Sequence, residues 1–330
     1  MTNIIPEVEK ELIIDELKGK LLCHTQKATN EIYIIDAHNS PNTMREIGRL
    51  REISFRQGGG GSGNPIDIDE YDSLEKPFLQ LIVWNPEEQE IIGGYRFLHG
   101  QDASFDSQGR PIMPMGHIFN FSERYIKEYL PYSIELGRAF IQPKYQSYKG
   151  GIKSLYALDN LWDGIGMMIS TYDNIRFMVG KITIFPKMQI EARYSIMHFL
   201  KKFYADKDFL ILPIDNCEER VPANFAEYYD TLFSKDNIKD NLKILIGYLK
   251  DRGERIPPLI KAYIDLASTM KSFGTCLDHD FGNIYDTGIM IDIKDIHKNK
   301  MDRYLTYYMR KQSVINIVNN IGENSIFNKK

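Results

Sequence analysis

The stretch YSIELGRAFIQP, residues 132 to 143, combines the composition of a buried strand with two opposite charges. Glu135 and Arg138 lie three residues apart around Gly137, so strict alternation would send their side chains to opposite faces of a sheet. A β-bulge marked by Gly137 would add one residue, shift the alternation and turn both side chains into one cavity. The alternative is an ordinary internal ion pair or two charges at the rim. The bulge interpretation predicts a functional site on this strand.

Composition limits the class of protein. The chain has 330 residues, of which 43% are hydrophobic, so it can bury a full core. Its formal net charge of -4 argues against nucleic acid as a partner. The cysteines Cys23, Cys217 and Cys276 lie far apart without a CxxC pair, which disfavours a disulfide framework or a zinc site.

The N-terminus and the longest apolar windows bear on location. Residues 1 to 20 are acidic and amphipathic rather than basic and then apolar, as a signal peptide would be. No later window offers about 18 uninterrupted apolar residues. We therefore expect a cytoplasmic protein, with peripheral contact at the inner face of the membrane left open.

Hydrophobic periodicity predicts a mixed α/β (α+β) chain. Strands are expected at 31–37, 78–84, 90–100, 132–141, 175–184, 272–281 and 285–293, and helices at 5–20, 43–57, 152–171 and 189–204. The turn NPEEQ and a later Gly-Asn pair each join two strands, so the sheet should be mostly antiparallel. We expect a single domain over 1–330, with a helical insertion at 205–255 and a basic helix and tail at 295–330.

Several motifs stand in a characteristic order along the chain. LREISF contains Arg51 and Phe55, DIDEYD contains Asp69 and Asp72, GGYRF contains Arg96, and ELGRAFIQPKYQ follows. Over roughly residues 30 to 295 this order resembles the acyl-carrier-protein-dependent N-acyltransferases of the GNAT superfamily. That family makes ornithine and glycine lipids, includes proteins labelled haemolysins, and is distantly related to acyl-homoserine-lactone synthases.

The resemblance implies a reaction and a set of residues. A long-chain fatty acyl group, 3-hydroxylated in some members, would pass from acyl carrier protein to the amine of an amino acid such as glycine or ornithine. Glu135 would serve as the base and Arg138 would orient it or neutralise a substrate carboxylate. The residues implied in substrate binding are Arg51, Phe55, Asp69, Asp72, Arg96, Gly137 and Tyr145.

The acidic motif has two interpretations. In a solvated turn, Asp69 and Asp72 would cap backbone amides. In the family they would shape the acceptor end of the site, paired with Arg51 and Arg96, because buried arginines need carboxylate partners. A calcium site is disfavoured because the downstream Glu of an EF-hand loop is missing. We expect no metal and no cofactor.

The resemblance also implies that the donor lies between two strands that part, here 132–141 and 175–184, where its phosphopantetheine arm would lie like an added strand. Lys144, Lys149 and Lys153 flank the entrance and would attract an acidic carrier protein. The alternative is that they solvate the start of a helix. The insertion at 205–255 is a candidate wall for an acyl tunnel.

The run GGGGSG at 58–63 is either a mobile loop with an anion-binding nest or a connection of no consequence. It is not a Walker loop, since no Gly-Lys-Ser/Thr follows. Acyl-homoserine-lactone synthases have an aromatic residue here, which disfavours their acceptor, S-adenosylmethionine. Two alternatives to the aminolipid enzyme stay open: a non-catalytic acyl- or carrier-protein-binding module, and an enzyme like the lactone synthases.

Overall fold

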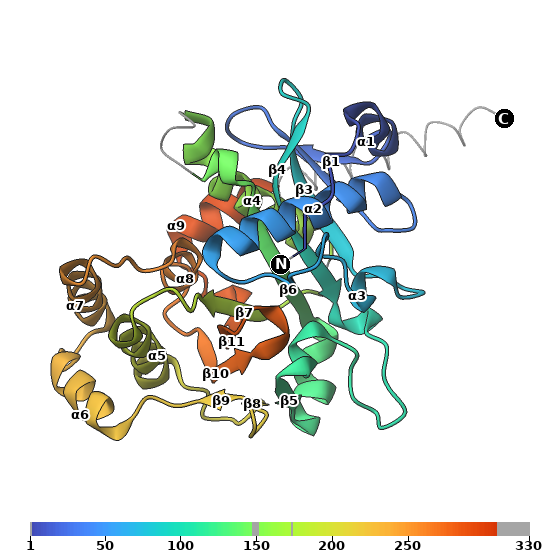
Figure 1. The fold of residues 1–330 in the computed structure, drawn as a ribbon. Helices are drawn as coiled ribbons and strands as arrows, with labels where there is room; N and C mark the ends of the chain where they lie inside the picture. The colour runs from blue at the N-terminus through green and yellow to red at the C-terminus, as the bar shows by residue number, and fades with distance from the viewer. Residues whose placement is uncertain (1, 147–151, 173, 309–330) are drawn as a thin grey trace.

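The computed structural model describes residues 2–146, 152–172 and 174–308. Within them, one nine-stranded sheet forms the centre of the molecule (Figure 1). In spatial order its strands are β1 (Leu21–His24), β2 (Glu31–Ile35), β3 (Leu79–Asn85), β4 (Glu90–His99), β6 (Ser133–Ile141), β7 (Phe177–Ile184), β11 (Ile284–Asp292), β10 (Lys271–Asp278) and β9 (Glu218–Glu219). Neighbouring strands are antiparallel except β6 and β7, which run parallel. The predicted mixed, mostly antiparallel sheet is confirmed.

Helices cover both faces of this sheet. They are α1 (Lys10–Leu17), α2 (Pro41–Gly58), α3 (Glu70–Ser73), α4 (Ile152–Thr171), α5 (Ile190–Tyr204), α6 (Ala223–Leu232), α7 (Ile238–Asp251), α8 (Pro258–Ile264) and α9 (Lys298–Lys300). Helix α2 packs in the cluster that holds Ile82, whereas α4 packs in the cluster that holds Leu81. Adjacent residues of a strand point to opposite faces, so α2 and α4 lie on opposite sides of β3.

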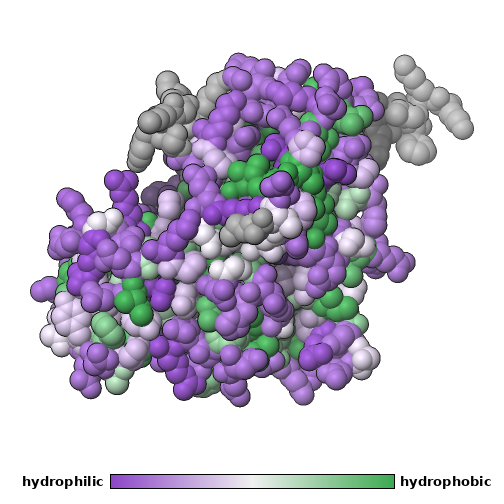
Figure 2. All heavy atoms as spheres, viewed as in Figure 1, coloured by the Kyte–Doolittle hydropathy of each residue, from purple (hydrophilic) through white to green (hydrophobic). Residues whose placement is uncertain are grey.

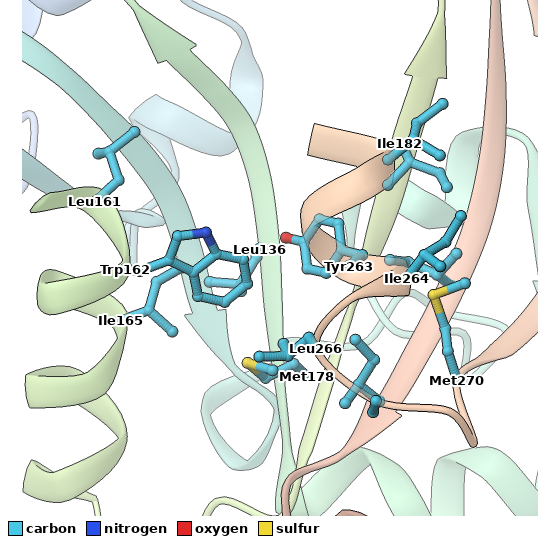
Figure 3. Close-up of a cluster of buried hydrophobic side chains, with 14 of the residues drawn as sticks. Leu136, Leu161, Trp162, Ile165, Met178, Ile182, Tyr263, Ile264, Leu266 and Met270 are labelled. Carbon is cyan, nitrogen blue, oxygen red and sulfur yellow. The ribbon is translucent and has the colours of Figure 1, made fainter. Parts of the chain in front are cut away.

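The largest core lies between the sheet and helices α4, α5 and α8. Trp162 of α4 packs edge-to-face against Tyr263 of α8, with ring centroids 5.5 Å apart. Figure 3 shows the two rings facing one another, with Leu136 of β6 labelled between them. This packing connects α8 to the middle of the sheet.

The structure adds elements that periodicity did not predict. Strand β1 was missed, and so was a small sheet in which β5 (Phe119–Phe121) pairs with β8 (Ile211–Pro213). The N-terminal helix is only α1, shorter than the expected 5–20. Both predicted hairpins, β3–β4 and β10–β11, are confirmed. Residues 309–330 of the expected C-terminal helix and tail lie outside the described residues.

The predicted bulge is present on β6. Gly94 of β4 pairs with Phe140 and Arg96 pairs with Gly137, so β6 carries one extra residue between these pairs. The bulge residue in the left-handed conformation is Arg138, with φ of 48°. An arginine in this conformation is uncommon and costs on the order of 1–3 kcal/mol, so its surroundings must hold it.

Strands β6 and β7 part beyond the bulge. Their parallel pairing runs from Ser133 with Phe177 to Leu136 with Gly180. Past that point β6 stays paired with β4 as far as Ile141, and β7 stays paired with β11 as far as Ile184. The sheet therefore contains a gap between two strands that are each held on their other side, as the family resemblance implied.

The face of the molecule drawn in Figure 2 is largely polar. On the face seen in Figure 2 hydrophilic residues predominate, and hydrophobic residues gather mainly above the N-terminus. Throughout the described ranges, no helix combines the length and apolar character needed to cross a membrane.

Candidate active site in the gap between two strands

A cavity of about 490 Å³ occupies the gap between β6 and β7. Its wall includes Glu135 and its neighbour Leu136, which point to opposite faces of the sheet. The same holds for Arg96 and its neighbour Tyr95 on β4. Residues of both faces thus line one space, which means that the cavity extends through the sheet where the strands part.

Glu135 is the buried acid of this cavity. Its side chain belongs to a residue only 3% exposed, and Oε1 accepts a 3.0 Å hydrogen bond from the backbone N–H of Met115. The other oxygen, Oε2, is buried and has no hydrogen-bond partner among the described residues. Burial raises the pKa of Glu135 to about 7, although the Met115 bond and the charges of Arg96 and Lys181 act in the opposite direction. Such a carboxyl group can both take and give a proton near neutral pH.

Arg138 lines the same cavity, as the bulge hypothesis predicted, but its ion pairs go elsewhere. Its Nε lies 3.1 Å from Oδ2 of Asp67, and its Nη2 donates to Oδ2 of Asp69 at 3.2 Å. The guanidinium carbon lies 4.0 Å from the centroid of the Phe281 ring. The alternative of an internal Glu135–Arg138 ion pair is therefore wrong, because Asp67 and Asp69 supply the carboxylates.

The acidic motif pairs with the two buried arginines, as predicted. Arg51 Nη1 lies 3.2 Å from Oδ2 of Asp72, and Arg96 Nη1 lies 2.5 Å from Asp69 Oδ1 and 3.2 Å from Asp72 Oδ2. The capping interpretation is also correct, since Asp69 and Asp72 form a capping box at the start of α3. One turn thus caps a short helix and neutralises three arginines. Arg51 and Asp72 are both buried, and neither lines the cavity.

Sequence reasoning missed a second group of charges on the other side of the gap. Lys181 of β7 lines the cavity, and its Nζ lies 2.8 Å from Asp286 Oδ2 and 3.4 Å from Asp278 Oδ2. Asp286 also accepts a 2.6 Å hydrogen bond from the hydroxyl of Thr183. The signal that could have pointed to them was a charge among apolar residues: Lys181 is the one charged residue of FMVGKITI, and Asp286 is one of two aspartates in YDTGIMIDI.

Charges of alternating sign follow one face of the sheet. Glu135 pairs with Val179 across the parallel strands, and Val179 and Lys181 share a face because they are two residues apart. Gly288 pairs with Lys181, which places Asp286 on that face too. Together with Arg96 on β4, the row reads positive, negative, positive, negative across four adjacent strands. A zwitterion such as a free amino acid suits this arrangement.

The opposite side of the cavity is apolar. Tyr95, Leu136, Leu259 and Tyr263 contribute to the wall there, beside the main core. Among the lining residues, Pro257, Pro258, Leu259 and Tyr263 are the ones nearest to the expected insertion in sequence. Helices α6 and α7 pack on α5 instead. None of residues 205–255 lines this cavity, and the segment that follows supplies part of its wall, so the acyl tunnel expected from the insertion stays a prediction.

The glycine run borders the cavity through Gly58, and two backbone amides at its end are already occupied. Buried Glu52 accepts hydrogen bonds from the backbone N–H groups of Ser62 at 3.0 Å and Gly63 at 2.8 Å. Glu52 also pairs with Arg56, whose Nε lies 2.7 Å from Oε1. The predicted anion nest exists, and the anion in it belongs to the protein. Phe55, at the end of α2, lines the cavity and packs edge-to-face on Phe281.

The remaining residues expected at the site lie away from the cavity or outside the described residues. Tyr145 is buried in the core and its hydroxyl bonds to Glu90 and Asn85, so it is not brought to the cavity. Lys144 forms ion pairs with Glu90 and Glu88. Lys149 and the side chain of Lys153 lie outside the described residues. Wherever side chains are described, no cluster of three or more His, Cys, Asp or Glu could hold a metal ion.

Comparison with known proteins gives close relatives. A family model described as an acetyltransferase (GNAT) domain matches residues 50–155. A glycine N(alpha)-acyltransferase of Phocaeicola vulgatus is 45% identical over 94% of this chain and 95% of its own length. One of the same name from Bacteroides thetaiotaomicron is 46% identical over 94% of this chain and 91% of its own. A solved N-acyl amino acid synthase from uncultured soil microbes matches 81% of this chain and 93% of its own, at 13% identity and a TM-score of 0.38.

Proposed function

Because the chain belongs to the GNAT acyltransferase family of these glycine N(alpha)-acyltransferases and is itself an N-acyltransferase, we propose that it joins a long-chain fatty acyl group to the amine of glycine. The acyl group would come from acyl carrier protein, as a phosphopantetheine thioester. The observation that carries the proposal is the buried Glu135 carboxyl group in a cavity that has a charged side and an apolar side. Ornithine is the second candidate acceptor.

The acceptor would bind on the charged side. Its ammonium group would lie at Glu135, whose Oε2 lacks a partner within the described residues. Its carboxylate would lie at Arg138, because a guanidinium has five N–H donors and its two ion pairs leave some of them unused. Stacking on Phe281 fixes the plane of that guanidinium and so orients the carboxylate.

The reaction removes two protons from the acceptor ammonium group and exchanges a C–S bond for a C–N bond. Glu135, with a pKa near neutrality, takes a proton from the ammonium, and the neutral amine attacks the thioester carbonyl carbon. The C–N bond forms, the C–S bond breaks, and the second proton of the attacking nitrogen passes to the departing sulfur, which leaves as a thiol. A backbone amide at the bulge would stabilise the developing oxyanion, a contribution of about 3 kcal/mol in comparable sites. Arg138 and Ala139 suit this role because β4 pairs with the residues on either side of them.

The donor arm would lie between the parted strands, with the acyl chain on the apolar side against Leu136, Leu259 and Tyr263. Its amides would bond to the inner edges of β6 and β7, in the manner of an added strand. The carrier protein would approach from the side of Lys149 and Lys153, as the sequence suggests. Lys144 contributes less than expected, since Glu90 and Glu88 already offset its charge.

A binding protein that has lost activity is the main rival. A pure acyl binder has no use for a buried carboxyl group, and burying one without a partner for Oε2 costs stability. The retention of Glu135 at this position favours the enzyme. An acceptor like that of the lactone synthases is disfavoured by the glycine run.

The direct experiment supplies purified protein with palmitoyl-acyl carrier protein or palmitoyl-coenzyme A and with glycine, ornithine or S-adenosylmethionine. Product is measured by mass spectrometry. We expect N-palmitoylglycine from the carrier-protein donor. Product with S-adenosylmethionine alone, or none with any amino acid, would overturn the proposal. Lipid extracts of cells that overproduce the protein supply an independent check.

A further inference from the structure

Two glycines stand next to each other where β6 and β7 part, and they differ in what surrounds them. Gly180 of β7 pairs with Leu136, the last pair before the gap. A Cβ added to Gly180 would lie 2.4 Å from the carbonyl oxygen of Leu136. That distance is far inside van der Waals contact, so close approach of the two strands requires glycine at this position.

Gly137 of β6, in contrast, has open space around its α-carbon. A Cβ added there would meet no atom within 4 Å, and the backbone of Gly137 is not in the left-handed region. Neither packing nor conformation therefore requires glycine at this position. In the interior of a strand glycine weakens the strand, so the open space beside it calls for another explanation.

The direction of that space can be read from the register. Gly137 pairs with Arg96 on β4 and follows Glu135 by two residues, so its missing side chain belongs to the charged face. Gly137, Glu135 and Arg138 all line the cavity. The unfilled volume thus lies next to Glu135 on this face of the sheet. Gly137 also directly precedes Arg138 in the chain.

We propose that Gly137 determines acceptor specificity: its missing side chain leaves the volume in which the α-carbon and carboxylate of a small amino acid lie between Glu135 and Arg138. This inference rests on the proposed function, in which Glu135 contacts the acceptor amine. It adds a steric limit on the size of the amino acid that the enzyme accepts. The space admits glycine most easily, and each further carbon on the α-carbon competes with the wall for the same volume.

The test is a series at Gly137 assayed by steady-state kinetics with both substrates varied. For Gly137→Ala we expect the KM for glycine to rise about tenfold and the KM for the acyl donor to stay within twofold. The preference for glycine over alanine, as a ratio of kcat/KM, should increase, because the added methyl group excludes the larger acceptor first. Gly137→Val should extend both effects. The Tm of Gly137→Ala should equal or slightly exceed that of the wild type, since alanine restricts the unfolded chain.

Two other glycines give matched controls. Gly180→Ala places a methyl group against the Leu136 carbonyl and should lower Tm. This variant shows how a packing defect at the gap affects the protein, for comparison with the Gly137 variants. Gly247→Ala lies in α7, away from the cavity and also with no atom within 4 Å of its added Cβ. It should leave both KM values unchanged.

Three outcomes would decide the matter. Unchanged glycine KM in both Gly137 variants, with Glu135→Gln inactive, would overturn the inference and leave the proposed function standing. A rise in donor KM alone would assign the space to the acyl donor and also overturn it. Wild-type turnover by Glu135→Gln would overturn the proposed base, whatever the Gly137 variants show.

Discussion

The backbone N–H of Met115 holds one oxygen of Glu135 at 3.0 Å, while Oε2 of the same carboxyl group is left without a partner in the described structure. One bond therefore fixes the orientation of the side chain and leaves an acceptor for an incoming proton. Because Arg138 is paired with Asp67 and Asp69, the carboxyl group of Glu135 is not needed to neutralise a buried cation. A role in proton transfer within the cavity explains why this carboxyl group is buried there.

The first prediction concerns the base. Glu135→Gln keeps the size of the side chain and can still accept the Met115 hydrogen bond, but it cannot take a proton. Single-turnover rates at pH 7 should fall by about 10²-fold or more, and raising the pH should recover part of the loss because more amine is already neutral. Tm should stay near that of the wild type. A variant whose activity falls only in proportion to its folded fraction would contradict the assignment.

The second prediction concerns pH and stability. Burial raises the pKa of Glu135 from its ordinary 4.5 to about 7, so between these values the folded state binds more protons than the unfolded state. The free energy of unfolding should therefore fall as pH rises through this window, by on the order of 3 kcal/mol at pH 8. Glu135→Gln lacks the titrating group and should lose this dependence. Urea unfolding of both proteins at pH 5 and pH 8 measures the difference, and parallel pH dependences would contradict the prediction.

The third prediction separates Arg138 from a generic cation. Arg138→Lys keeps the charge but loses planar contact with Phe281 and the geometry that reaches Asp67 and Asp69 together. We expect the KM for glycine to rise by about tenfold, with donor KM within twofold of the wild type. Initial rates with each substrate varied in turn test this. An equal rise in the KM for glycine and the KM for the donor would contradict a specific role of Arg138 in binding glycine.

The fourth prediction concerns Arg51, which is buried but lies outside the cavity wall. Arg51→Met removes a charged partner of Asp72 and a hydrogen bond to Gln80, and should lower the free energy of unfolding by about 3 kcal/mol. The kcat of the folded fraction should stay within twofold. Arg124→Met is the surface control: Arg124 pairs with Glu128 on the exposed surface, and its loss should leave the free energy of unfolding close to that of the wild type.

The fifth prediction concerns chain length. Leu259 lines the apolar side of the cavity, so Leu259→Trp should shorten the space for an acyl chain. The preferred donor should shift toward shorter chains, with turnover of the shortest substrates unchanged. Tyr263→Phe, which keeps the ring, is the control and should leave the chain-length profile as it was. Competition among acyl-carrier-protein donors of different length measures both, and an unaltered profile in Leu259→Trp would place the chain elsewhere.

Local sequence predicted the site where neighbouring residues decide the geometry. The break in alternation between Glu135 and Arg138 is visible within one strand, and it predicted the bulge. The pairing of Arg51 and Arg96 with Asp69 and Asp72 followed from the charges that burial requires.

The missed features depend on segments far apart in the chain. Lys181 meets Asp286 only because β7 pairs with β11, and no short-range pattern specifies that pairing or its register. Tyr145 follows the Glu-Gly-Arg strand closely in sequence, yet Glu90 draws its hydroxyl away from the gap. The break in alternation did not show which residue of the bulge takes φ > 0; that residue is Arg138, and two carboxylates and a ring hold it.

The glycine run after α2 bears on the order in which the protein can be completed during synthesis. A Cβ on Gly282, in the turn between β10 and β11, would come within 2.9 Å of the Cα of Gly60, so the two backbones touch. Phe281 beside this contact covers Arg138 and packs on Phe55. A nascent chain therefore leaves the bulge uncovered until the last hairpin has emerged from the ribosome, some 140 residues after Arg138. Truncation before that hairpin should yield no partly active enzyme, since the arginine loses its ring and the cavity loses one wall.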